Sequence, residues 1–311
     1  MTFFKPRKIK GNFDLYQSYP YYTPGIAGML GLLLWLLAGA LLGNLLTLVL
    51  SMTSGAEFVA EYGMFISYPV MFIPAMIFAS YQSKRNALFD TGYSLNSSHF
   101  GKAGGFAAAL MAMVLTVSVG YMTDAVNTLL PAMPDWLEKM LDSMTRGNLW
   151  VNFVCVSIFA PIFEEWLCRG EVLRGLLNHK NSEGKTMSPA IAIALSALFF
   201  AIIHANPWQA IPAFFLGCAF GYVYYKTGSL WLTMLMHFTN NTLALVLSNI
   251  DSLKDFDNWK QILGTTTYWI VFLVLGLAVF FLLKAFRDIP LNAPQGNCDV
   301  IKSSEEEGPS L

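Results

Sequence analysis

The sequence predicts an all-α polytopic membrane protein with about eight transmembrane helices, and its composition is the first reason. Of the 311 residues, 55% are hydrophobic and only 13% are charged, whereas a soluble domain carries about 25% charged residues. Such a surface could not be solvated by water, so the lipid bilayer is the expected environment. The net charge of -1 offers no basic surface to a nucleic acid, which we therefore exclude as a partner.

The spacing of apolar segments is the second reason. A helix needs about 20 mostly apolar residues to cross the hydrocarbon core of a bilayer. Eight segments meet or approach this length, and each is expected to form a helix: 26–52, 64–81, 103–122, 149–178, 189–204, 208–225, 229–250 and 267–285.

The positions of the basic residues support this count and orient the chain. With eight spans and a cytoplasmic amino terminus, most of the 19 Lys and Arg residues fall on the inner side, as the positive-inside rule expects. The exceptions are Lys139, Arg146, Lys254 and Lys260. Both termini are therefore predicted to be cytoplasmic.

These spans divide the chain into five parts. Residues 1–25 and 286–311 are polar and are expected to form cytoplasmic tails. Residues 26–148 carry the first three spans and an amphipathic segment, 134–144, which we expect to lie flat on the outer surface. Residues 149–250 form a core that holds the intramembrane polar residues, and 251–285 contain the last span.

Acidic residues and histidines within the spans are few and are clustered in this core. Glu164 and Glu165 are adjacent in the fourth span, His204 ends the fifth, and His237 lies in the seventh. Ionisable groups are costly within a bilayer and usually mark a functional path. Given the rise of about 1.5 Å per residue, Glu164 and His204 lie about 21–22 Å from the inner ends of their helices. The sequence therefore allows one shared site.

Helical spacing indicates which of these side chains face each other. Glu165 and Arg169 are four residues apart, so they share a helix face and can form a charge pair. Glu164 points about 100° away from Glu165. His237 and Asn241 are also four residues apart and project together. A carboxylate, two imidazoles and an amide can together activate water and stabilise an oxyanion.

Three motifs occur in order, each on a predicted span: Glu164-Glu165-x-x-x-Arg169, Phe200-x-x-x-His204 and His237-x-x-x-Asn241. Together they resemble the CPBP family (CAAX proteases and bacteriocin-processing enzymes, also called the ABI family) of intramembrane proteases. The resemblance covers roughly residues 150–250, so that the core 149–250 is interpreted as a CPBP-like catalytic core.

The resemblance implies an intramembrane endopeptidase. By analogy with the family, Glu164 and His204 activate the attacking water, while His237 and Asn241 stabilise the oxyanion of the tetrahedral intermediate. The substrate implied is a membrane-associated or lipidated peptide or a membrane protein.

Three further residues are assigned supporting roles. By resemblance, Glu165 and Arg169 are structural partners that fix the site, and a buried ion pair serving helix packing explains them equally well. Phe200 is expected to pack against the site rather than to react.

The sequence leaves the cofactor open. The family is often described as metalloproteases, and in that case Glu164, His204 and His237 would hold zinc, since two His and one carboxylate form an acceptable catalytic set. No H-E-x-x-H motif is present, and direct activation of water by Glu and His without a metal is the slightly favoured alternative.

Two other classes of function compete with proteolysis. A non-catalytic membrane scaffold, or a protein of bacteriocin self-protection, could use the same fold. Intramembrane Glu and His also serve as proton relays in transporters, but here no inverted repeat of broken helices accompanies them. With no organelle signal evident, we expect a bacterial inner (plasma) membrane; the sequence does not indicate an oligomeric state.

Overall fold

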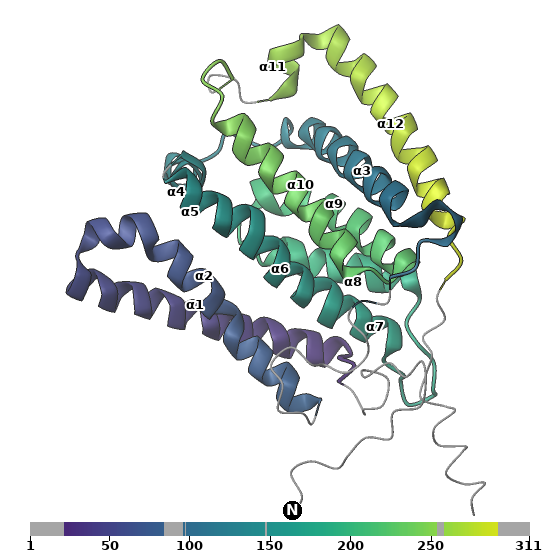
Figure 1. Ribbon diagram of the computed structural model, residues 1–311, viewed down its shortest axis with the longest axis horizontal. Coiled ribbons are helices and arrows are strands. Elements are labelled where there is room, and N and C mark those ends of the chain that lie inside the picture. The colour runs from purple at the N-terminus through teal and green to yellow at the C-terminus, as the bar shows by residue number, and fades with distance from the viewer. Residues whose placement is uncertain (1–21, 84–95, 97, 147, 254–257, 292–311) are drawn as a thin grey trace, which may run out of the picture.

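The structure is a computed structural model that describes residues 22–83, 96, 98–146, 148–253 and 258–291. All regular elements in these ranges are helices, and no strand is found among them. This confirms the all-α prediction (Figure 1). Most of the two predicted tails, 1–25 and 286–311, lies outside the described residues.

The helices follow the predicted segments closely. The amino-terminal half contains α1 (Ile26–Ser54), α2 (Ala56–Gln82), η1 (Gly101–Ala103), α3 (Gly104–Asn127) and α4 (Asp135–Arg146). A continuous helical rod follows, built of α5 (Leu149–Asn152), η2 (Phe153–Phe159), α6 (Ala160–Glu165), η3 (Trp166–Leu173) and α7 (Arg174–Asn178). The last helices are α8 (Pro189–Ile202), α9 (Pro207–Thr227), α10 (Leu230–Ser248), α11 (Trp259–Leu263) and α12 (Thr265–Arg287).

Among the described residues, six helical segments are long and apolar enough to cross a bilayer: α1, α2, η1 with α3, the α5–α7 rod, α10 and α12. Integral membrane insertion is thus supported, but the count of eight spans is not confirmed. α8 has only 14 residues and rises about 21 Å, against a hydrocarbon core of about 30 Å. α9 has 21 residues but is less apolar than these six segments, and it contacts α3, α8, α10, α12 and η3.

The hairpin of α1 and α2 packs through two glycines. A Cβ added at Gly39 would lie 1.9 Å from the carbonyl oxygen of Met71, and one at Gly43 would lie 3.1 Å from that of Ser67. This is the small-x-x-x-small arrangement that lets membrane helices approach closely. This close contact fixes which face of α2 packs against α1, namely the face that carries Ser67 and Met71.

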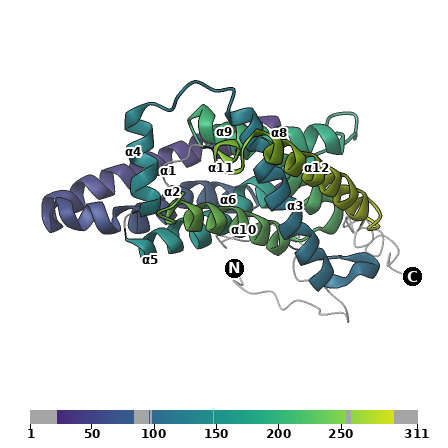
Figure 2. The same cartoon turned by 90° about the horizontal axis from the view of Figure 1, so that it is seen from above.

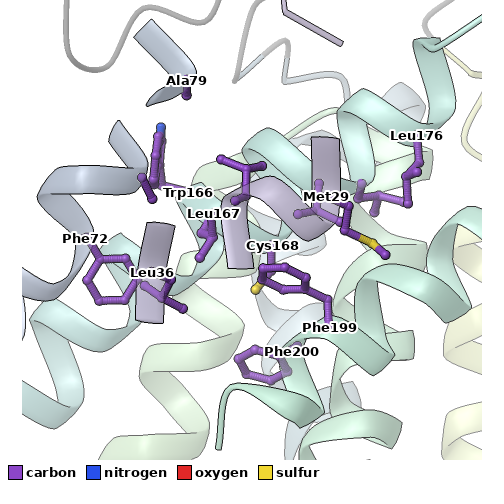
Figure 3. Close-up of a cluster of buried hydrophobic side chains, with 14 of the residues drawn as sticks. Met29, Leu36, Phe72, Ala79, Trp166, Leu167, Cys168, Leu176, Phe199 and Phe200 are labelled. Atoms are coloured by element: carbon purple, nitrogen blue, oxygen red, sulfur yellow. The ribbon is translucent and has the colours of Figure 1, made fainter. Parts of the chain in front are cut away.

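An apolar cluster joins this hairpin to the rod and to α8. Figure 3 shows Leu36 of α1 and Phe72 of α2 with Leu167 and Cys168 of η3 and Phe199 of α8, all of them buried. Removal of this surface from contact with solvent or lipid fixes the hairpin against the rod. The hairpin and α8 therefore reach the same stretch of rod that carries the two glutamates.

The amphipathic segment forms α4, which runs crosswise to the long helices (Figure 2). Leu137 on its inward face is buried, whereas Trp136 is 66% exposed. A helix that crosses the ends of a bundle in this way can lie along a membrane surface.

Candidate active site

The two glutamates lie on a distorted part of the rod. Glu164 and Glu165 end α6, and the segments on both sides of α6, η2 and η3, are π-helical. π-helical turns within α-helices are rare and occur frequently at functional sites. The distortion changes the direction in which side chains leave the rod, so the simple 100° spacing does not fix where each one points.

Glu165 and Arg169 form the ion pair that their spacing predicts. Arg169 Nη1 donates to Glu165 Oε1 at 2.7 Å, and both side chains are fully buried. Arg169 Nη2 donates to the carbonyl of Gly217 at 3.0 Å. The guanidinium also lies over the rings of Phe200 and Phe220, 4.6 and 5.3 Å from their centroids. The charge is thus held by a carboxylate, a carbonyl and two aromatic faces.

His237 of α10 lies between the two carboxylates. Its Nδ1 is 3.0 Å from Glu165 Oε1, and its Nε2 is 4.0 Å from Glu164 Oε2. Since a carboxylate only accepts, Nδ1 carries a hydrogen and Nε2 faces Glu164. Phe200 packs edge-on against this imidazole, with the ring centroids 5.4 Å apart, in the packing role that the sequence predicts.

Glu164 is held from α2 by a residue that the sequence analysis missed. The hydroxyl of Tyr68 donates to Glu164 Oε1. No sequence signal connects the two residues, which are 96 positions apart, and a lone Tyr in an apolar span is common. The other oxygen, Oε2, is buried and has no hydrogen-bond partner among the described residues, so one lone-pair face of the carboxylate remains available.

His204 lies in a turn rather than at the end of a helix. α8 ends at Ile202, because Asn206 and Pro207 begin α9 only a few residues later. Ala205 takes a left-handed φ of 55°, a strained conformation for a residue with a Cβ. His204 Nδ1 lies 2.8 Å from the carbonyl oxygen of Phe200; it therefore carries the hydrogen and leaves Nε2 as an acceptor.

Asn241 fills a gap in the backbone bonding of the rod. Its Nδ2 donates to the carbonyl of Val156 at 2.8 Å. In the π register of η2 that carbonyl would accept from residue 161, which is Pro161 and has no N–H. The N–H of Ala160 is bonded to Cys155. Asn241 thus ties α10 to the rod, and Asn240 Nδ2 donates to its Oδ1 at 3.1 Å.

These side chains line one cavity of about 700 Å³. Glu164, His204, His237 and Asn241 all contribute to its wall, and Tyr68 lies beside them. The rest is mainly apolar and comes from α1, α2, α4, α8, α9 and α10, including Met140 and Leu141 of α4 and Leu33, Leu36 and Leu37 of α1. Glu165 and Arg169 are buried behind this wall and do not line it.

The residues do not fit the zinc set that the sequence left open as an alternative. Within the described parts of the chain, no three His, Cys, Asp or Glu side chains are arranged to hold a metal ion. The set Glu164, His204 and His237 is therefore not assembled as a ligand cluster here.

Helices of membrane-spanning length, packed around a cavity lined by a carboxylate, imidazoles and an amide, define a class: a polytopic α-helical membrane protein with a polar site among its helices. Residues 146–243 match the family model described as type II CAAX prenyl endopeptidase Rce1-like. This match confirms the resemblance to the CPBP proteases on the part of the chain that holds the site, and the matched family is a family of proteases. No curated protein matches the chain, and no solved structure matches it.

Proposed function

We propose that this protein is an intramembrane endopeptidase that hydrolyses a peptide bond in a membrane-associated or lipidated peptide. One observation carries the proposal. Glu164, which has one carboxylate oxygen without a hydrogen-bond partner among the described residues, lines the same cavity as His204, His237 and Asn241. The match to a protease family over 146–243 supports it.

Glu164 is the proposed general base. Tyr68 holds Oε1, which leaves Oε2 to take a proton from water as the water oxygen bonds to the substrate carbonyl carbon. The Nε2 of His204 is an acceptor in the tautomer that its bond to Phe200 requires, so it can accept the second hydrogen of that water and orient it. This assignment keeps the roles that the family resemblance implies.

His237 and Asn241 are the proposed donors to the oxyanion. The Nδ1 of His237 lies against Glu165, so its contact with the oxyanion is assigned to Nε2, which donates when the ring carries a hydrogen on both nitrogens. Asn241 uses one amide hydrogen for Val156, and the second can donate to the oxyanion.

The reaction balances without a further reactant. Water supplies the oxygen that bonds to the carbonyl carbon and the proton that Glu164 takes. When the C–N bond breaks, Glu164 returns this proton to the leaving nitrogen, giving a carboxylic acid and an amine. The mainly apolar wall of the cavity favours a substrate with an apolar or lipidated segment.

We propose also that both termini face the cytoplasm, on the basis of the Lys and Arg distribution, and that the membrane is a bacterial inner membrane. Under this orientation, α4 lies on the outer surface.

The test is cleavage of quenched fluorescent lipidated peptides by the purified full chain in detergent. Glu164→Gln should lower kcat at least a hundred-fold, because removal of a general base typically costs 10²–10⁴. Glu183→Gln, in an exposed loop, is the matched control and should cleave normally. The wild type and both variants are assayed with and without a zinc chelator. Cleavage by the wild type and by Glu183→Gln should persist in the presence of the chelator.

Full cleavage by both Glu164→Gln and His204→Ala would refute the assignment. Loss of wild-type cleavage in chelator, restored by zinc, would instead favour the metalloprotease alternative.

A further inference from the structure

A second cavity lies on the side of α9 away from the hairpin and is separate from the catalytic cavity. It has a volume of about 860 Å³ and lies between α3, α9 and α12. We call it the α3–α9–α12 groove. Its wall is apolar and includes Leu115 and Met122 of α3, Phe215 of α9, and Phe272 and Val279 of α12. Figure 1 shows α3 and α12 at the edge of the bundle opposite the α1–α2 hairpin.

The buried residues of α12 lie only near its ends. They are Tyr268 and Phe286, about 27 Å apart along the helix. Tyr268 packs against Tyr121 of α3, whose hydroxyl donates to the Tyr268 carbonyl at 3.1 Å. Phe286 is fully buried in a cluster with Ala108 and Ala112 of α3. Between these anchors the side chains of α12 are only partly buried, with Val279 packed against the same cluster, and the groove opens beside them.

The charge on the groove is confined to one end. Lys284 and Arg287 line it near the Phe286 anchor, and both are exposed. Asp288 lies 3.4 Å from Arg287, but both side chains are 65% exposed, so the pair neutralises little. An apolar groove with a cationic mouth matches a molecule with apolar chains and an anionic head.

We propose that the α3–α9–α12 groove binds an anionic phospholipid, with its acyl chains along the apolar wall and its phosphate at Lys284 and Arg287. Basic pockets between transmembrane helices bind anionic lipid head groups, and the chains would fill the space that α12 leaves between its anchors. The bound lipid would join α12 to the helices that carry the site. This proposal does not depend on proteolysis.

The experiment is native mass spectrometry of the full chain in detergent, titrated with phosphatidylglycerol or with phosphatidylcholine of the same chains. Phosphatidylglycerol should bind at least ten-fold more tightly. The double variant Lys284→Gln with Arg287→Gln should weaken its binding ten- to thirty-fold, because each basic residue at an anionic lipid surface contributes about five-fold. Both residues are exposed, so this variant should fold.

Two controls separate the groove from general attraction. Lys180→Gln with Lys185→Gln removes two exposed charges from the loop between α7 and α8 and should leave binding unchanged. Val279→Trp fills the groove and should lower the binding of both lipids, whereas Leu273→Trp on the exposed face of α12 should not.

Equal binding of the two lipids, or equal phosphatidylglycerol binding by wild type and by the Lys284 and Arg287 double variant, would overturn the proposal. The proposal would also be overturned if the mass spectra showed a dimer of the chain instead of bound lipid, and if the dimer disappeared in Val279→Trp.

Discussion

The Nδ1 of His237 lies 3.0 Å from Oε1 of Glu165, the same oxygen to which Arg169 donates at 2.7 Å. Glu165 is therefore shared between a charge partner on its own helix and the imidazole of α10. Through it, the buried ion pair behind the cavity fixes the ring orientation of His237. A carboxylate that orients a histidine in this way sets which ring nitrogen faces the site.

Breaking this pair should destabilise the protein. Arg169→Met leaves the Glu165 carboxylate buried and unpaired, at a cost of about 3–5 kcal/mol. Adding Glu165→Gln removes the unpaired charge, so the double variant should be more stable than Arg169→Met alone. Thermal unfolding in detergent measures both. Strictly additive losses would show that the pair is not coupled.

Tyr68 should act on catalysis rather than on folding. Tyr68→Phe removes one hydrogen bond to a charged carboxylate, worth about 1.5–3 kcal/mol, and should lower kcat about ten-fold or more with little change in KM. Tyr62→Phe changes a partly exposed tyrosine of the same helix and is the control. An unchanged pH profile and kcat for Tyr68→Phe would remove Tyr68 from the site.

Pro161 should affect catalysis because it has no backbone N–H to donate to the carbonyl of Val156, which leaves that carbonyl to Asn241. Pro161→Ala supplies an N–H that can bond to the Val156 carbonyl and displace Asn241. We expect kcat to fall several-fold while thermal stability is kept or improved. Pro189→Ala, at the first turn of α8, should leave cleavage unaffected. If Pro161→Ala cleaves as wild type does, the tether from Asn241 to Val156 has no part in catalysis.

Gly39 should be intolerant of any side chain. Gly39→Ala places a Cβ 1.9 Å from the Met71 carbonyl oxygen, so α1 and α2 must separate, at a cost of about 1–3 kcal/mol. The shift would also displace Tyr68 and lower kcat. In Gly276→Ala the added Cβ meets only Met122 Cε at 3.6 Å, an ordinary contact. Equal melting temperatures for the two variants would contradict this account of the hairpin.

Much of the candidate site could be predicted because its residues are unusual in their surroundings. Carboxylates and imidazoles within apolar segments are conspicuous, and helical spacing pairs Glu165 with Arg169. The same approach could not find Tyr68, which is an ordinary residue of a membrane helix. Nor could it anticipate that Asn241 bonds to Val156, because that bond depends on the π-helical register of η2.

The sequence by itself determined that the described part of the chain is helical, that the protein is an integral membrane protein and that its candidate site residues lie in the core 149–250, since these properties follow from composition and from periodicity along one segment at a time. Only the structure decided that α8 ends at Ile202, where the turn that carries His204 begins, and is therefore too short to count as a clear span. It also decided which nitrogen of each histidine faces the cavity. These features depend on contacts between helices far apart in the chain, which no local pattern of residues encodes.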